Sequence, residues 1–225
     1  MGCGHGSRLR AETGTAACRH GHGHVIYKMK YCEKDFIDQV WNILSSRERR
    51  VIEHPPFSHA AVLVPLFKKG EGCHILFTKR TDQVKYHKGE ISFPGVVFDE
   101  EDSELISTAL REANEEIGLK ESDVQIVGVL DDIVTITEFI VTPFVGLFSY
   151  PYPFKLSPIE IEELIEVPLS YLLDEECFGE RVIVRGDRKE VVYSYQYGNH
   201  IIWGATARIL KQFLDLITSQ RQPHD

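Results

Sequence analysis

Three glutamates near the middle of the chain are the residues best suited to chemistry. Glu112, Glu115 and Glu116 recur at helical spacing, and at about 100° per residue they fall on one flank of a helix. Their mutual repulsion and their position in the last helical turns each cost about 0.2 to 1 kcal/mol. A divalent cation would offset this cost, because hard cations such as Mg²⁺ bind carboxylate oxygens and keep waters and phosphate oxygens as further ligands. The cluster thus predicts a metal site, and an ordinary solvated helix face is the alternative.

The helix that must carry these glutamates has clear sequence signals. Asp102 or Ser103 is expected to be its N-cap, and Gly118 suits the left-handed position after its last turn. Arg111 lies four residues before Glu115, where it can pair with that carboxylate. An apolar stripe on the other side of the helix consists of Ile106, Ala109, Leu110, Ala113 and Ile117.

The segment before the helix predicts a strand followed by a tight turn. Ile91, Ser92 and Phe93 are strand-like, and Pro94-Gly95 reads as a turn. A strand, a turn and a helix with convergent carboxylates can offer the Gly95 carbonyl oxygen and side-chain oxygens to one ion.

The remaining elements alternate between strand and helix patterns, which predicts an α/β or α+β class with a mixed sheet flanked by helices. Strands are expected at 60–67, 74–78, 124–130 and 139–148, with a further hairpin of 181–185 and 190–195 around Gly186-Asp187. Helices are expected at 35–47 and 205–217, and a short acidic helical stretch at 158–166.

Length and composition favour one globular domain. The 225 residues are 43% hydrophobic and 26% charged, and we expect a flexible arm at 1–28, a domain at 29–220 and a short tail at 221–225. A net charge of -9 argues against nucleic-acid binding. The apolar runs are too short to span a membrane, and five scattered cysteines favour a reducing, cytoplasmic location. A homodimer is compatible with this sequence.

The central segment closely resembles the Nudix hydrolase signature, G-x5-E-x7-R-E-U-x-E-E-x-G-U with U aliphatic. Its second half is matched by the run from Arg111 to Leu119. The upstream runs 77–81 and 87–95 are similar to the extended motif of the coenzyme A pyrophosphatase branch. Further likeness lies in 130–132, 141–143, 166–169 and 202–208, so the resemblance covers roughly residues 35 to 215.

The resemblance implies a Nudix α/β/α sandwich that hydrolyses the diphosphate of coenzyme A or its thioesters. The products would be 3',5'-ADP and 4'-phosphopantetheine or its acyl form. It implies Mg²⁺ or Mn²⁺ on Glu112 and Glu116, assisted by Glu115 and the Gly95 carbonyl. Another nucleoside diphosphate derivative, such as ADP-ribose or a dinucleotide, and a non-hydrolysing nucleotide-binding protein are the alternatives.

Further roles follow for residues around this site. The proton of the attacking water goes to a carboxylate, with Glu116, Glu160 and Glu163 as equal candidates. Arg80, His87 and Lys88 are expected to meet substrate phosphates. Trp203 is expected to pack in the core rather than to form a platform for adenine.

Two positions depart from the family pattern. Val96 stands where the branch has a second glycine, and a β-branched residue would strain any positive φ. The signature glutamate is expected eight residues before Arg111, where this chain has Ser103, while Glu101 lies ten before it. Asp102 or Glu104 is the candidate to take over its structural role.

Overall fold

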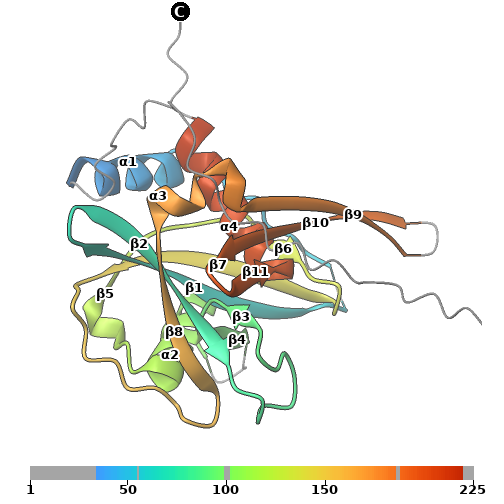
Figure 1. The fold of residues 1–225 in the computed structure, drawn as a ribbon, viewed down its shortest axis with the longest axis horizontal. Coiled ribbons are helices and arrows are strands. Elements are labelled where there is room, and N and C mark those ends of the chain that lie inside the picture. The colour runs from blue at the N-terminus through green and yellow to red at the C-terminus, as the bar shows by residue number, and fades with distance from the viewer. Residues whose placement is uncertain (1–33, 55, 99–101, 186–187, 220–225) are drawn as a thin grey trace, which may run out of the picture.

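A computed structural model describes residues 34–54, 56–98, 102–185 and 188–219 (Figure 1). The arm at 1–28, the tail at 221–225, the domain limits 29 and 220, the Gly186-Asp187 turn and Glu101 lie outside the described residues. The helices are α1 (Lys34–Ser45), α2 (Leu105–Ile117), α3 (Leu169–Leu172) and α4 (Gly204–Ser219), with 3₁₀ turns η1 (Glu121–Asp123) and η2 (Glu175–Cys177). The strands are β1 (Ser58–Lys69), β2 (Gly72–Arg80), β3 (Ile91–Ser92), β4 (Gly95–Val97), β5 (Val124–Val129), β6 (Ile133–Val134), β7 (Phe139–Phe148), β8 (Ile161–Pro168), β9 (Phe178–Arg185), β10 (Arg188–Tyr197) and β11 (His200–Trp203).

The main sheet is mixed, as predicted. Its central pair, β1 and β7, runs parallel from Ser58 opposite Phe139 to Phe67 opposite Phe148. The other pairings are antiparallel: β2, joined to β1 by a tight hairpin, carries β8 and β3, and β4 pairs with β1. This pairing brings the end of β2, the turn before β4 and the start of β8 to one region of the sheet.

Helices cover both faces of this sheet, which makes the fold an α/β/α sandwich (Figure 1). Alternating side chains of β1 and β2 explain the two layers, because successive residues of a strand point to opposite faces. On one face Leu63 and Leu76 pack against Ala109 and Ala113 of α2. On the other, Leu66 and its neighbours pack with apolar side chains of α1 and α4.

Residues 158–166 do not form the predicted acidic helix. The structure has a turn at 158–160, and the chain then enters β8, which pairs with β2 from Ile161 opposite Arg80 to Pro168 opposite His74. Ile161 and Ile165 are both buried and four residues apart, a spacing that also fits a helix. The unpaired edge of β2 decides the outcome, because its backbone groups need a partner strand.

Helix α2 ends as predicted but begins later. Gly118 caps it in the left-handed conformation with φ 71°. Its N-cap is Glu104, which makes no side-chain cap, instead of Asp102 or Ser103. The Asp102 carboxylate instead accepts hydrogen bonds from Arg111 and Thr108. A bond to Arg111 joins two charged groups and is therefore stronger than a cap bond from a neutral backbone N–H.

A second sheet, with strand order β11-β10-β9, contains the predicted hairpin and leads into α4. Trp203 at the end of β11 is 47% exposed, so the expectation that it packs in the core was wrong. Ile202 beside it is fully buried, which follows from the alternation of a strand with one exposed face. In the part of the chain that is described, no helix is both long and apolar enough to cross a membrane.

Candidate active site

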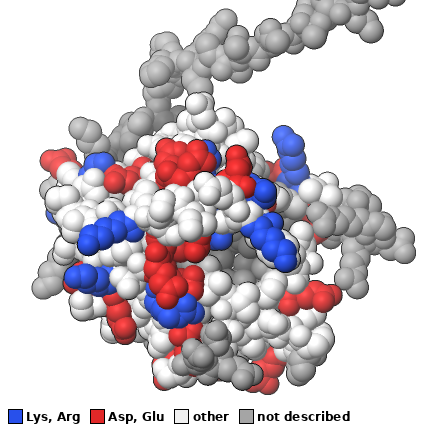
Figure 2. Space-filling model, turned by 90° about the horizontal axis from the view of Figure 1, so that it is seen from below, with Lys and Arg blue, Asp and Glu red and all other residues white. Residues whose placement is uncertain are grey.

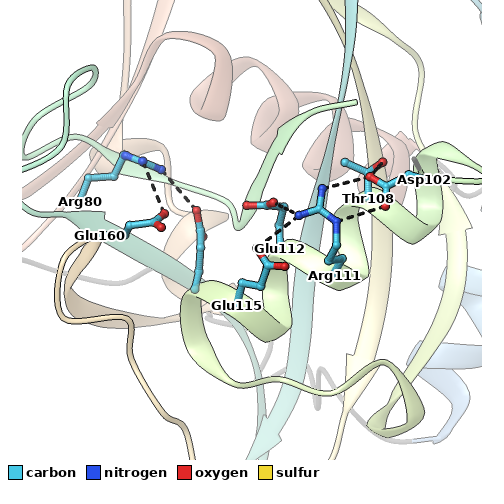
Figure 3. Close-up of polar contacts among 8 residues, drawn as sticks. Arg80, Asp102, Thr108, Arg111, Glu112, Glu115 and Glu160 are labelled. Carbon is cyan, nitrogen blue, oxygen red and sulfur yellow. Dashed lines mark hydrogen bonds and ion pairs between the residues drawn. The ribbon is translucent and has the colours of Figure 1, made fainter. Parts of the chain in front are cut away.

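Arg111 organises one half of the glutamate cluster (Figure 3). Its Nε and Nη2 donate to the two oxygens of Asp102 at 3.1 and 3.0 Å. Its Nη1 donates to Glu112 and, at 3.3 Å, to Glu115. Two bonds to one carboxylate fix the plane of the guanidinium, so Asp102 sets the direction in which Arg111 holds both glutamates. Sequence reasoning had left this role open between Asp102 and Glu104.

Arg80 organises the other half. From the end of β2 its Nη1 donates to Glu116 Oε1 at 3.3 Å, and its Nη2 lies 3.9 Å from Glu160 Oε2 (Figure 3). Backbone hydrogen bonds bring these residues together: Ser157 N donates to Glu116 O, and Thr81 N donates to Glu160 O, both at 2.8 Å. The segment before β8 is therefore tied to both α2 and β2, and it carries Glu160 to Glu116.

The two inner glutamates differ sharply from the outer one in burial. The Glu116 side chain is 2% exposed and that of Glu112 11%, whereas that of Glu115 is 57% exposed. Burial raises the pKa of Glu116 to about 8, against the lowering effect of Arg80. Burial also raises the pKa of Glu112, and the Arg111 hydrogen bond opposes this shift. A bound cation would stabilise the charged form of both carboxylates and so offset the cost of burying their charge.

The carboxylates of Glu112, Glu115 and Glu116 are the donors that a hard divalent cation prefers. Among the described residues, no three His, Cys, Asp or Glu side chains converge at metal-binding geometry, because the arginines divide the glutamates between them. Glu116 Oε2, however, is buried without a hydrogen-bond partner. Such an oxygen is costly to leave unpaired, and a bound cation would satisfy it. Acidic side chains also gather on the face that lies below in Figure 1, with basic ones beside them (Figure 2).

Gly95 lies against the central strand and accepts no larger residue. Its φ is 152°, and a Cβ atom there would come within 2.2 Å of the Ala61 carbonyl oxygen and 2.6 Å of Val62 Cα. Val96, in contrast, pairs with Ala61 in β4 and does not have a positive φ. The strain expected at Val96 is absent, since an extended strand suits a β-branched residue.

The ion pairs of Glu163 and His87 involve residues outside this cluster. Glu163 is on β8 opposite Lys79, with Oε1 3.6 Å from His200 Nε2 of the second sheet. His87 is 59% exposed and its Nδ1 lies 2.8 Å from Glu90 Oε2. Lys88 is exposed on the same turn. Sequence reasoning had no signal for His200, because only the fold brings β11 to β8.

The raised pKa of Glu116 predicts a pH-dependent stability of the metal-free protein. Well below pH 4.5 the Glu116 carboxyl is protonated in both the folded and the unfolded state and has no effect on stability. As the pH rises toward 8 the unfolded state loses this proton first, so the folded state loses stability. At about 1.4 kcal/mol per pKa unit, Glu116→Gln should gain on the order of 2 to 5 kcal/mol at pH 9 and little at pH 5.

Thermal denaturation in EDTA at pH 5, 7 and 9 checks this expectation. A gain of about 1 kcal/mol corresponds to roughly 2–4 °C in Tm for a domain of this size. Glu115→Gln is the matched control, because it removes a carboxylate that already lies in water. An equal Tm difference at all three pH values for Glu116→Gln would contradict the assigned burial cost.

Comparison with known proteins relates this chain to one family. The family model for the NUDIX domain matches residues 57–155. The chain is 38% identical over 154 residues to the "Uncharacterized Nudix hydrolase NudL" of Photorhabdus laumondii, covering 68% of this chain and 82% of the relative. The NudL protein of Escherichia coli (strain SMS-3-5) is 32% identical over 179 residues, covering 79% and 91%. A crystal structure of a MutT/nudix family protein from Enterococcus faecalis is similar with a TM-score of 0.47 and 11% identity, covering 87% of this chain and 78% of that one. The chain therefore belongs to the Nudix hydrolase family.

Proposed function

We propose that this protein hydrolyses the diphosphate bond of coenzyme A or its thioesters with the help of Mg²⁺ or Mn²⁺. The observation that carries the proposal is the buried pair Glu112 and Glu116 within the matched Nudix domain, together with the unpartnered Oε2 of Glu116. The coenzyme A substrate rests on the upstream runs 77–81 and 87–95. The products are 3',5'-ADP and 4'-phosphopantetheine or its acyl form.

Glu112 and Glu116 would hold the cation, and Glu115 and the Gly95 carbonyl oxygen would complete the protein ligands. When bound, the cation neutralises the diphosphate and makes a water acidic enough to attack phosphorus at neutral pH. Arg111 keeps Glu112 and Glu115 directed toward the site through its contacts with Asp102. Burial of Glu112 and Glu116 strengthens their electrostatic interactions, because water is largely excluded from them.

Among the carboxylates that could take the proton, we favour Glu116 and Glu160 over Glu163. Glu160 Oε2 lies 3.9 Å from Arg80 Nη2, which in turn contacts Glu116. Glu163 contacts His200 of the second sheet instead. Arg80 meets the substrate diphosphate, and His87 and Lys88, exposed on the neighbouring turn, contact phosphates farther from the bond that breaks.

Asp102→Asn should lower Mn²⁺ affinity roughly tenfold or more, because partners that orient metal ligands typically contribute 10- to 100-fold. The change removes the charge that fixes Arg111 without touching a proposed ligand. Isothermal titration with Mn²⁺ measures the affinity. Glu104→Gln is the matched control, since Glu104 makes no side-chain cap. Equal affinity in wild type and Asp102→Asn would contradict the orienting role.

The test of the proposal is product analysis after incubation with coenzyme A, acetyl-coenzyme A, ADP-ribose and a dinucleotide, each with Mg²⁺, Mn²⁺ or EDTA. We expect metal-dependent release of 3',5'-ADP from the coenzyme A compounds. Cleavage of the other nucleotides alone would overturn the substrate and keep the chemistry. Binding of all of them without cleavage would favour a nucleotide-binding role. We expect the enzyme to act in the cytoplasm on small nucleotides, and size-exclusion chromatography tests for a homodimer.

A further inference from the structure

The two arginines of the site hold their glutamates in different ways. Arg111 makes two hydrogen bonds to Asp102 and one each to Glu112 and Glu115. Arg80 makes a single long bond, 3.3 Å, to Glu116, and it leaves its own Nε and the second oxygen of Glu116 buried without partners. Strong arginine–carboxylate pairs are shorter and often bidentate. The contact of Arg80 with Glu116 is therefore poorly satisfied on both sides.

We propose that Arg80 is an exchangeable counterion, which pairs with Glu116 when the metal is absent and moves to the substrate diphosphate when a divalent cation takes Glu116. This inference rests on the proposed metal-dependent hydrolysis. Its geometric basis is the position of Arg80 between Glu116 and Glu160, with Nη1 and Nη2 aimed at different carboxylates. Figure 3 shows Arg80 apart from Arg111, on the far side of Glu112 and Glu115.

The exchange follows from charge. A cation bound to Glu116 neutralises the negative charge that pairs with Arg80, and it also repels the Arg80 guanidinium. Arg80 is then a largely buried cation with a weaker partner, since Glu160 is 43% exposed and lies at 3.9 Å. Leaving such a charge unpaired is costly, and a diphosphate oxygen restores its partner. Metal and substrate should therefore bind cooperatively, and by linkage each should tighten the other by the same factor.

The first measurement is Mn²⁺ affinity without substrate, by calorimetry or by the electron paramagnetic resonance signal of free Mn²⁺. Arg80→Met should bind Mn²⁺ more tightly than wild type, by about fivefold or more, because the competitor of the metal is gone. Removing Arg80 also favours protonation of Glu116. The divalent ion gains twice as much as the proton from loss of a nearby positive charge, so metal binding still improves.

Two variants serve as controls. Lys79→Met removes the same charge from the adjacent position, where Lys79 Nζ contacts Glu162 at 2.9 Å, and it should bind Mn²⁺ like wild type. Arg80→Lys keeps the charge and should stay close to wild type. Equal affinity in Arg80→Met and wild type, or equal tightening in Lys79→Met, would overturn the exchange.

The second measurement is the coupling between Mn²⁺ and methylenediphosphonate, a diphosphate analogue that cannot be hydrolysed. In wild type Mn²⁺ should tighten its binding by about fivefold or more. In Arg80→Met this coupling should be smaller, because only the direct attraction between the metal and the phosphonate oxygens remains. Unchanged coupling in Arg80→Met overturns the exchange alone, provided that wild type binds Mn²⁺ and cleaves its substrate. A wild type that binds no Mn²⁺ overturns the exchange together with the proposed function, so the two failures are distinguishable.

Discussion

Glu116→Gln should lower the rate of diphosphate hydrolysis about a thousandfold while the protein stays folded. The side chain combines 2% exposure, a contact with Arg80 and an unpartnered oxygen. An amide offers one neutral oxygen where the proposed chemistry needs a charged ligand or a proton acceptor. Loss of one preorganised electrostatic group typically costs 10² to 10³ in rate, and loss of a metal ligand adds to this. Initial rates at saturating Mg²⁺ measure the effect.

The matching changes at Glu160 and Glu163 test which carboxylates act in the reaction. Glu160→Gln should cost more activity than Glu163→Gln, because only Glu160 lies beside Arg80 in the cluster with Glu116. Circular dichroism tests whether Glu116→Gln is folded, and the Tm gain expected at high pH is a second check. Near-normal activity in a folded Glu116→Gln, or loss of activity in Glu163→Gln alone, would refute this assignment of roles.

Gly95→Ala should destabilise the fold by roughly 3 kcal/mol or more and abolish activity at the same time. The added Cβ would lie 2.2 Å from the Ala61 carbonyl oxygen, which belongs to central strand β1. Backbone cannot give way as a flexible side chain does, so β4 must move away from β1. Overpacked sites typically cost 1–3 kcal/mol, and here the backbone conformation is an additional penalty. Urea denaturation measures the loss.

Gly70→Ala is the matched control for this change. Gly70 lies in the hairpin between β1 and β2 with φ 62°, and an added Cβ there would meet nothing within 4 Å. It should cost only the conformational penalty of about 1–2 kcal/mol. If Gly95→Ala costs no more than Gly70→Ala, the close packing of β4 on β1 does not have the importance assigned to it.

The local part of the site was readable from the sequence because helical spacing is a short-range property. Glu112, Glu115 and Glu116 lie on α2, which ends at Gly118 as its left-handed cap predicted. Arg111 pairs with Glu115 four residues later, as expected. Strands β1, β2, β5 and β7 of the main sheet and the closing helix also lie near their predicted ranges, since their apolar patterns are regular.

The errors share a physical cause, which is competition from contacts that apolar spacing does not show. The 158–166 segment became a turn and the start of a strand because β2 had a free edge. Asp102 left its expected capping role because Arg111 offered two charged hydrogen bonds. Trp203 is exposed because the second sheet turns its Ile202 side inward. Arg111 is only nine residues from Asp102, but a pattern of apolar spacing does not show this pairing, and β2 lies far from β8 along the chain.

By itself the sequence determined which side chains can do chemistry and which helix carries them, because residue types and a 3.6-residue period suffice for that. The tertiary structure alone decided that the glutamates are shared between two arginines, one firmly held by Asp102 and one loosely placed between Glu116 and Glu160. It also decided which carboxylates are buried, and therefore which of them resists ionisation. Burial and long-range pairing depend on how β2, β8 and α2 meet, and that meeting is a property of the whole fold.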